Sequence, residues 1–341
     1  MNRKSILTTT YILLVISLLS SCHKKAGTEN YKPSTIGKSS ELSIVIEDTY
    51  WKDSLGQELK KTFKQAVPHL PQDEPMFDLS QITPLIFKDA FLKTRNLLIV
   101  QIDPKHVAPS LSTADNVYAR PQSIAYLKAA SPKEAKDYIA KGSKVLIKYF
   151  LKKNRDAQIE TNKDFDDLKL QTDVREKFGV DMVLTPGYRK ATLPDRDDNF
   201  MWLDFNGSIA RMGIIIYTSP YTNEEMFSKE AIITRRNELL QKYVLGNKEN
   251  SYMTTEVRLA PSTENIDFKG KYAVEMRGLW KMENDFLGGP FVGLTILDEK
   301  NNRLITVEGF VSAPATDKRD FMRQVEAIVY SLSFPEEQVA Q

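Results

Sequence analysis

Cys22 is the only cysteine of the 341-residue chain, and it ends an N-terminal segment with the chemistry of a bacterial lipoprotein signal. Arg3 and Lys4 supply a positive start, and a mostly apolar stretch runs from 6 to 19. Because such a segment is removed from the mature protein, residues 1–21 are predicted to be a signal peptide that does not belong to the fold. The thiol of Cys22 is then predicted to carry acyl chains that anchor the protein to a membrane.

Two alternatives are an ordinary signal peptide and a membrane-spanning helix, each with an incidental cysteine. A span needs about 20 apolar residues. The apolar stretch here is shorter and contains Thr8, Thr9, Thr10 and Ser17, so the sequence favours the lipid anchor. Stable attachment takes two or more lipid signals, which a diacylglycerol and an amide-linked chain together would supply.

A lipidated Cys22 leaves no thiol for a disulfide, a cysteine metal site or thiol catalysis. Stability must therefore come from a hydrophobic core, which 41% apolar residues can supply. The chain has 47 basic side chains, of which two lie in the signal, and 45 acidic ones, so the mature protein carries no net charge. Because no basic cluster is interleaved with aromatic residues, nucleic-acid binding is not expected.

Residues 22–40 are polar and have no apolar periodicity, so they predict a flexible tether that spans roughly 20–25 Å. Cys22 is not followed by a run of acidic residues, the type of signal that is linked to surface export in some lipoproteins. His23 stands at the position where an aspartate retains many lipoproteins at the inner membrane. Both observations favour an outer-membrane lipoprotein of the bacterial cell envelope that faces the periplasm.

The N-terminal half alternates strand and helix signals. The apolar run 42–46 predicts a strand, and Leu55, Leu59 and Phe63 recur every four residues, as on one face of a helix. The continuous apolar run 97–100 predicts a strand that is buried on both faces. This order predicts a mixed sheet covered by helices.

Capping signals predict where further helices begin. Thr83 and Pro84 resemble an N-cap followed by proline at the first helical position. Capping boxes at 131–134 and 222–225 open two more helices. Another helix is predicted from 161 to 178, where Gly179 ends it.

The last hundred residues predict an antiparallel meander followed by a helix. The expected strands are 252–259, 272–280, 291–297 and 304–311, and the helix is 316–332. The fold class is therefore α+β. The chain divides into an N-terminal α/β unit (41–155) and a C-terminal α+β unit (160–335), with a boundary between Asn154 and Asn162 unless the two units form one continuous domain.

Metal-ligand and histidine patterns are weak. His69 and His106 lie in proline-containing connections and are expected to be surface-loop residues. Residues 195–199 place oxygen ligands at alternate positions, but Phe200 replaces the glycine and Asn206 the glutamate of an EF-hand loop. This segment predicts a solvated turn, and we expect no metal or cofactor.

Four residues are candidate ligand contacts. Arg277, Trp280 and Phe291 could form an aromatic-rimmed loop over a glycine hairpin, with Arg277 binding a carboxylate. The alternative is that Trp280 belongs to the core and that Gly288 and Gly289 merely make a turn, and the sequence favours this alternative.

The fourth candidate, Trp51, follows the first strand at a strand-to-helix junction, where sheet proteins often place binding groups. Glu47, Asp48 and Tyr50 stand beside it, and paired carboxylates can perform acid–base chemistry. The alternative is that Asp53 or Ser54 simply caps the next helix. No catalytic motif stands out in the chain, so enzyme activity has no positive support.

Several segments resemble a family of uncharacterised Bacteroidota lipoproteins that is known only as a domain of unknown function. They are Cys22 after its signal and the ranges 41–56, 95–100, 184–191, 277–280, 288–293 and 321–332. The resemblance implies an envelope location and a single long domain, and it carries over no active-site role.

The leading hypothesis is a lipid-anchored, non-enzymatic envelope protein that binds or helps assemble another envelope component. Its partners would be the membrane, through the anchor, and an envelope protein. The alternative is a periplasmic glycan- or peptide-binding module, or a weak carboxylate-based hydrolase, centred on Trp280 and the glycine hairpin.

Overall fold

The structure, a computed structural model, describes residues 32–195, 197 and 199–335. The predicted signal peptide (1–21) and the predicted lipid attachment site Cys22 lie outside these residues. Within the described part of the chain, no helix is both long enough and apolar enough to cross a membrane.

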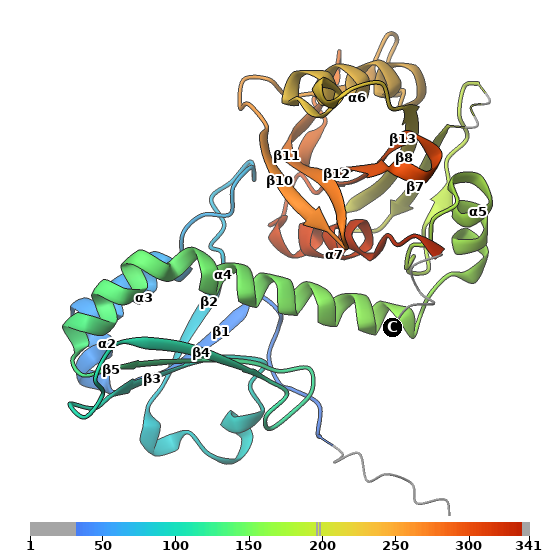
Figure 1. The fold of residues 1–341 in the computed structure, drawn as a ribbon. Coiled ribbons are helices and arrows are strands. Elements are labelled where there is room, and N and C mark those ends of the chain that lie inside the picture. The colour runs from blue at the N-terminus through green and yellow to red at the C-terminus, as the bar shows by residue number, and fades with distance from the viewer. Residues whose placement is uncertain (1–31, 196, 198, 336–341) are drawn as a thin grey trace, which may run out of the picture. The chain divides into compact units, whose positions relative to one another are not determined.

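The described chain is α+β, as predicted, and contains two sheets (Figure 1). The N-terminal sheet is mixed, because four strands run parallel to one another and one edge strand is antiparallel to its neighbour. In spatial order its strands are β2 (Asp78–Ile82), β1 (Glu41–Val45), β3 (Asn96–Ile102), β5 (Ser123–Ala129) and β4 (Ser110–Asp115).

Each face of this sheet has a different cover. One face packs against α3 (Ser54–Phe63) and α4 (Pro132–Lys163), which bury Leu98 and Val100 of β3. The other face buries Leu97 and Ile99 beneath the segment that links β2 to β3. The continuous apolar run of β3 is thus buried on both faces, as its pattern predicts.

The prediction of a helix that begins after Thr83 is wrong. The chain forms two short 3₁₀ helices instead, η1 (Pro84–Ile86) and η2 (Asp89–Lys93). Asp89 has φ +51°, a left-handed conformation that an α-helix does not contain. Phe87, between the two turns, packs against the second face of the sheet and fixes the segment there.

Helix α4 begins at its predicted capping box, where Ser131 Oγ accepts from the Glu134 amide at 3.3 Å. It then continues for 32 residues, so the predicted helix start at 161 is wrong. The boundary expected between Asn154 and Asn162 lies inside this helix. Asn154 is buried within the helix, where its side chain donates to the Phe150 carbonyl at 2.8 Å and to Asn96 Oδ1 at 2.9 Å. The following helix, α5 (Leu168–Phe178), ends at Gly179 in the left-handed conformation, as predicted.

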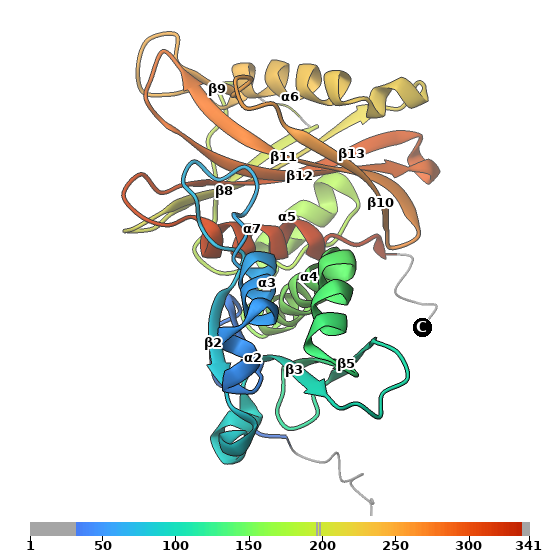
Figure 2. The same ribbon diagram turned by 90° about the vertical axis from the view of Figure 1, so that its left-hand side faces the viewer.

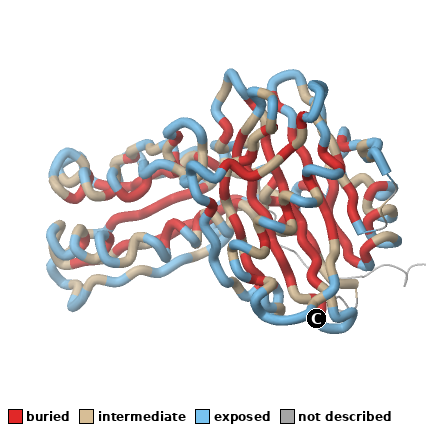
Figure 3. Tube along the Cα trace, turned by 90° about the horizontal axis from the view of Figure 1, so that it is seen from above, coloured by how far each residue is buried: buried red, intermediate tan, exposed pale blue. Residues whose placement is uncertain are grey.

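The C-terminal sheet has eight antiparallel strands and contains the predicted meander (Figure 2). Its strands in spatial order are β10 (Ser262–Phe268), β11 (Lys271–Glu283), β12 (Gly288–Asp298), β13 (Arg303–Ser312), β8 (Arg211–Pro220), β7 (Phe200–Asn206) and β6 (Arg189–Lys190), while β9 (Tyr252–Thr255) pairs with β11. Helix α6 (Lys229–Tyr243) packs on one face, and α5 and α7 (Arg319–Ser331) pack on the other. Figure 3 shows that the strands are mostly buried and their connections exposed.

The second capping box opens a different element from the one predicted. Asn223 caps a 3₁₀ helix, η3 (Glu224–Phe227), by accepting from the Glu225 amide. Ser228 then accepts from the Ala231 amide at 3.2 Å and begins α6. The helix therefore starts later than the box indicates.

The predicted tether (22–40) is wrong at its C-terminal end. Ser34 forms a bridge with Arg120, and Ile36 forms one with Thr94. The Ile36 amide donates to the Lys93 carbonyl at 2.9 Å, so these residues belong to the folded structure.

Candidate functional site

Two of the four predicted ligand contacts are core residues. Trp280 is only 3% exposed, and its Nε1 donates to the Val311 carbonyl at 3.2 Å. Phe291 is 1% exposed, and its ring centroid lies 4.0 Å from the guanidinium carbon of Arg236. Trp280 thus belongs to the core, as in the alternative that the sequence favours, and neither ring offers a free surface to a ligand.

The glycines of that loop lie in a strand and not in a turn. Gly289 pairs with Trp280 inside β12. A Cβ atom there would lie 2.0 Å from the Val311 carbonyl oxygen, so this position admits no side chain. The turn between β11 and β12 begins instead at Asn284, which has φ +57°.

Arg277 does bind carboxylates, as its chemistry predicts, but they belong to the same chain. It makes two hydrogen bonds to Glu275, of 2.7 and 2.9 Å, and one of 3.1 Å to Glu326. Arg155 donates to the other oxygen of Glu326 at 2.8 Å. Burial disfavours the charged form of Glu326, but the two guanidinium groups outweigh it and lower its pKa to about 2. Such a carboxyl is ionised near neutral pH and is a poor general acid.

Trp51 belongs to a different part of the structure. It lies on α2 (Asp48–Lys52) and packs against the core of the N-terminal sheet, whereas Trp280 and Phe291 share a cluster beneath α6. The ammonium of Lys60 lies 4.2 Å from the centroid of the Trp51 ring. The structure therefore does not bring the four candidates together into one site.

His69 has a partner that sequence spacing could not indicate. Its Nε2 lies 2.8 Å from the hydroxyl of Ser262, which stands 193 residues further along the chain. Burial and the charge of Arg277 lower the pKa of His69. Its buried Nδ1 has no hydrogen-bond partner among the described residues, so no third group orients the ring as in a catalytic triad.

The predicted solvated turn contributes no metal site among the described residues. There, no group of three or more His, Cys, Asp or Glu side chains could hold a metal ion. Asp197 instead accepts from the Asn199 amide at 2.7 Å and from the Tyr243 hydroxyl.

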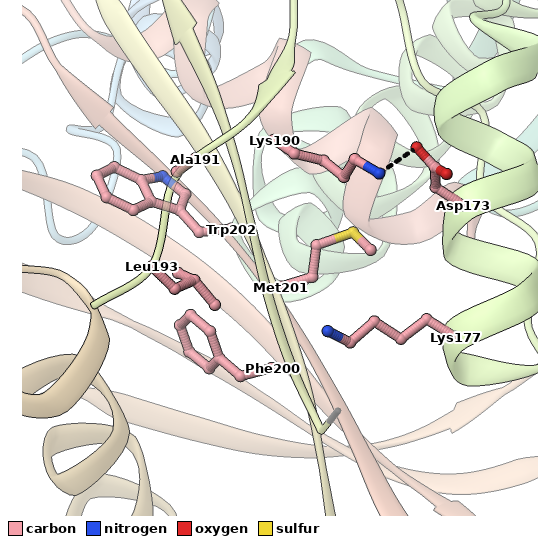
Figure 4. A pocket seen from close by; sticks show the side chains of 8 residues that line it. All are labelled: Asp173, Lys177, Lys190, Ala191, Leu193, Phe200, Met201 and Trp202. Carbon is pink, nitrogen blue, oxygen red and sulfur yellow. Dashed lines mark ion pairs between the residues drawn. The ribbon is translucent and has the colours of Figure 1, made fainter. Parts of the chain in front are cut away.

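A hollow of about 200 Å³ opens beside strand β7 (Figure 4). Strand β6 is only two residues long and pairs with β7 at Asp204 and Leu203, and the Ala191 amide after it donates to the Trp202 carbonyl at 2.9 Å. The edge of β7 is less covered before residue 202, and the hollow lies beside this part of the strand. Its lining residues come from α5, β6, β7 and the connection between the two strands: Asp173, Lys177, Lys190, Ala191, Leu193, Phe200, Met201 and Trp202.

The period-2 alternation of a strand sorts this lining into two sides. Met201 belongs to the core beneath α5 and α7, whereas Phe200 and Trp202 pack with the core beneath α6. Figure 4 shows the two lysines on the Met201 side of β7 and the Trp202 ring on the other side. The hollow thus extends around the edge of the sheet, with charged groups on one side and aromatic groups on the other.

Positive charge exceeds negative charge in this lining. Lys190 Nζ lies 2.8 Å from Asp173 Oδ2. Lys177 Nζ donates to the backbone carbonyl of Asp197 at 2.7 Å. The lining itself carries two ammonium groups and one carboxylate, and the charge of Lys177 also acts on the nearby Asp197 carboxylate. A ligand with an acidic group suits this lining.

Trp202 adds a hydrogen-bond donor. Its Nε1 is buried and has no hydrogen-bond partner among the described residues. Buried indole N–H groups usually have an acceptor, because an unmet donor in a dry site costs about 1–3 kcal/mol. An acceptor atom of a ligand would satisfy it.

A second hollow, of about 330 Å³, lies near Tyr221, Phe227 and Tyr272. Its only charged lining residue is Glu224, and none of its lining residues has a buried polar side-chain atom without a partner. The hollow beside β7 is therefore the better candidate site.

This arrangement defines an α+β protein with a small hollow at a sheet edge that two lysines line, and each half of the chain matches one family model. Residues 35–163 match "Domain of unknown function (DUF8532)", and residues 167–331 match "Domain of unknown function (DUF4837)". The predicted resemblance to a domain of unknown function is confirmed, whereas the Bacteroidota lipoprotein origin stays a prediction.

Among solved structures, the chain is similar to the Ran-binding protein Mog1p of Saccharomyces cerevisiae and to a point mutant of the protein Mog1. The sequence identities are 14% and 13%, the TM-scores are 0.30 and 0.29, and each match covers 46% of this chain and 90% of the other. A likeness this weak carries no argument about fold or function. No curated protein matches the chain.

Proposed function

We propose that this protein is a lipid-anchored, non-enzymatic protein of the bacterial cell envelope that binds another envelope component. The hollow beside β7 would hold an acidic group of that component. One observation carries the proposal: two lysines line the hollow on one side of β7, and on the other side lies a buried indole N–H that has no hydrogen-bond partner among the described residues.

The size of the hollow limits what it can bind. Sites for complete small molecules usually enclose about 300–1,000 Å³. The hollow is smaller, at about 200 Å³, so it suits a single acidic group that projects from a larger component. Lys177 and Lys190 would provide the charge, and Trp202 would provide a donor and an apolar wall.

The surroundings of the ionisable groups support binding rather than catalysis. Glu326 has a pKa of about 2, and the ring of His69 has no orienting partner on Nδ1 among the described residues. Neither group has the properties of a general acid or base that works near neutral pH.

The test is photo-crosslinking in intact cells with a tagged full-length protein. A photoreactive residue at Leu193, in the lining of the hollow, should capture one dominant envelope component. The same residue at Val145, an exposed position on α4, is the matched control and should not capture it. A Cys22→Ala strain should lose the product because the protein is no longer anchored.

Charge neutralisation tests the role of the lysines. Replacement of Lys177 and Lys190 by glutamine should reduce the Leu193 product at least about tenfold, as expected when close charge pairs are lost. The control replaces two exposed lysines of α4, Lys141 and Lys144, by glutamine and should leave it unchanged. Equal products from both double variants, or no product at all, would contradict the proposal.

A glycan- or peptide-binding module is the second candidate, and the Trp202 wall of the hollow favours it. Sugar rings and peptide side chains both stack on indole rings while polar groups at the rim fix their orientation. A Trp202→Phe variant keeps the wall and removes the donor. Titration with acidic oligosaccharides and acidic peptides should show which of them binds and whether the variant weakens that binding.

A further inference from the structure

Three segments beside the N-terminal sheet carry exposed apolar side chains, and the C-terminal end of the second segment joins the other two. They are residues 34–36, the η1–η2 segment and the connection between β4 and β5. Their exposed apolar residues are Ile36, Leu85, Ile86, Phe91, Val117 and Tyr118. Leu85 is 87% exposed, although a leucine at the end of a helical turn could fold back onto the sheet as Phe87 does.

Hydrogen bonds fix these segments together. Gln122 Nε2 donates to the carbonyls of Leu92 and Thr94 at 2.6 and 2.8 Å. The Ile36 amide donates to the Lys93 carbonyl, and the Thr35 amide donates to the Arg120 carbonyl. The apolar side chains are thus held outward by an ordered backbone, which marks an interaction surface rather than a loose loop.

The surface is also basic. Its exposed charged residues are Lys88, Lys93 and Arg120 against Asp89 alone. Arg95 lies in the same region, but it is turned inward and donates to Asn154 Oδ1 at 2.9 Å. Apolar side chains flanked by basic ones are the composition that binds the interface of an anionic bilayer.

Chain length limits how far this surface can be from the predicted anchor. Ser34, whose backbone pairs with Arg120, stands twelve positions after Cys22. Twelve residues span at most about 40 Å in any conformation. Figures 1 and 2 both show the η1–η2 segment on the side of the sheet away from α3 and α4.

We propose that the surface formed by Leu85, Ile86 and Phe91 with Lys88 and Lys93 inserts into the bilayer interface that holds the acyl chains of Cys22. This inference rests on the proposed lipid anchor. Contact with the bilayer would hold the N-terminal sheet against the membrane and restrict the orientations that the anchored protein can adopt.

The test uses the full-length lipidated protein in vesicles of phosphatidylethanolamine and phosphatidylglycerol. Because Cys22 is acylated, a cysteine at Leu85 or Phe91 is the only free thiol and can carry a polarity-sensitive fluorophore. The control is Val107→Cys, which is fully exposed at 102% in the loop between β3 and β4, outside the proposed surface. Nitroxide-labelled lipids should quench the probes at 85 and 91 at least about threefold more than the probe at 107, as expected for side chains about 5–10 Å deep in the interface.

Two further measurements separate the possible failures. Mass spectrometry of the same preparation reports acylation of Cys22: an unmodified thiol would refute the anchor and this inference together. Acylated protein with equal quenching at 85, 91 and 107 would refute the membrane contact and leave the anchor intact. Replacement of Lys88 and Lys93 by glutamine should lower the quenching at Leu85 on these vesicles, and unchanged quenching would count against the role of charge.

Discussion

Two groups of charged side chains lie in different surroundings. Arg236 and Glu308 face each other between α6 and the C-terminal sheet, with side chains only 1% and 3% exposed. The second group, which we call the interhelix network, consists of Arg155, Glu326, Arg277 and Glu275. It connects α4 with α7 and β11, and its side chains are 11–29% exposed.

The buried pair is fully hydrogen-bonded inside one core. Arg236 makes two hydrogen bonds to Glu308, of 2.6 and 2.7 Å, and a third to the Thr255 hydroxyl at 2.8 Å. Its guanidinium also lies over the ring of Phe291. A buried pair of this kind adds little net stability compared with apolar residues, but removal of one partner leaves a desolvated charge.

The interhelix network joins segments that are far apart in the sequence. Arg155 on α4 and Glu326 on α7 are separated by 171 residues. Tyr330 donates its hydroxyl to Glu275, and Arg155 lies 3.5 Å from the Tyr330 ring centroid. The buried pair therefore stabilises one core, whereas the network couples the long helix of the N-terminal half to the C-terminal sheet.

The largest effect is expected at the buried pair. Glu308→Ala should lower the free energy of unfolding by about 3–5 kcal/mol, because the guanidinium of Arg236 stays buried without its carboxylate. The double variant Arg236→Met, Glu308→Leu should lose much less unfolding free energy, since no unpaired charge remains in the core. Urea unfolding of both variants measures the difference, and equal losses would show that the unpaired charge is not the cause.

A smaller effect is expected in the interhelix network. Glu326→Gln removes the charge that Arg155 and Arg277 share, and hydrogen bonds to charged groups contribute about 1.5–3 kcal/mol. We expect a loss of about 2 kcal/mol, since water still reaches these side chains. The control Glu299→Gln, at an exposed position in the β12–β13 connection, should be neutral. If Glu326→Gln lowered the free energy of unfolding as much as Glu308→Ala does, the buried pair and the interhelix network would not differ in the way proposed.

The network should also respond to pH. The pKa of Glu326 is about 2 in the folded chain, compared with an ordinary value of 4.5. A carboxyl with a lowered pKa contributes stability above its ordinary pKa, and that contribution is lost as the pH falls through the folded value. The stability difference between the native chain and Glu326→Gln should therefore be constant above about pH 4.5 and should vanish near pH 2. Urea unfolding across this range measures it, and a difference that persists at pH 2 would contradict the shifted pKa.

Much of the fold could be predicted because its signals are local. The run 97–100, the capping box at Ser131 and the C-cap at Gly179 each depend on neighbouring residues, and each prediction is confirmed. The η1–η2 segment could not be predicted, because packing of Phe87 against the sheet overrides a helix start at Thr83.

The charged groups and the candidate site were not predictable from local patterns. Arg155 and Glu326 each look like solvated helix residues until the fold brings α4 and α7 together. Likewise, Lys190 reads as an edge-strand lysine and Trp202 as an ordinary strand residue. The hollow lies where β6 ends early beside α5. The hydrophobic pattern of a strand does not indicate where its neighbouring strand ends, so the sequence could not predict the hollow.

The smallest effect is expected at an exposed contact of α4, the ion pair between Lys148 on α4 and Glu264 on β10. Its nitrogen and oxygen are 2.5 Å apart, but the side chains are 67% and 55% exposed. Exposed pairs contribute only about 0.2–1 kcal/mol, because water screens them and both side chains lose freedom. Glu264→Gln should thus change the free energy of unfolding by less than about 1 kcal/mol, and added salt should reduce the change further. If Glu264→Gln lowers the free energy of unfolding as much as Glu326→Gln does, then solvent exposure does not explain why the interhelix network should stabilise the fold more than this ion pair.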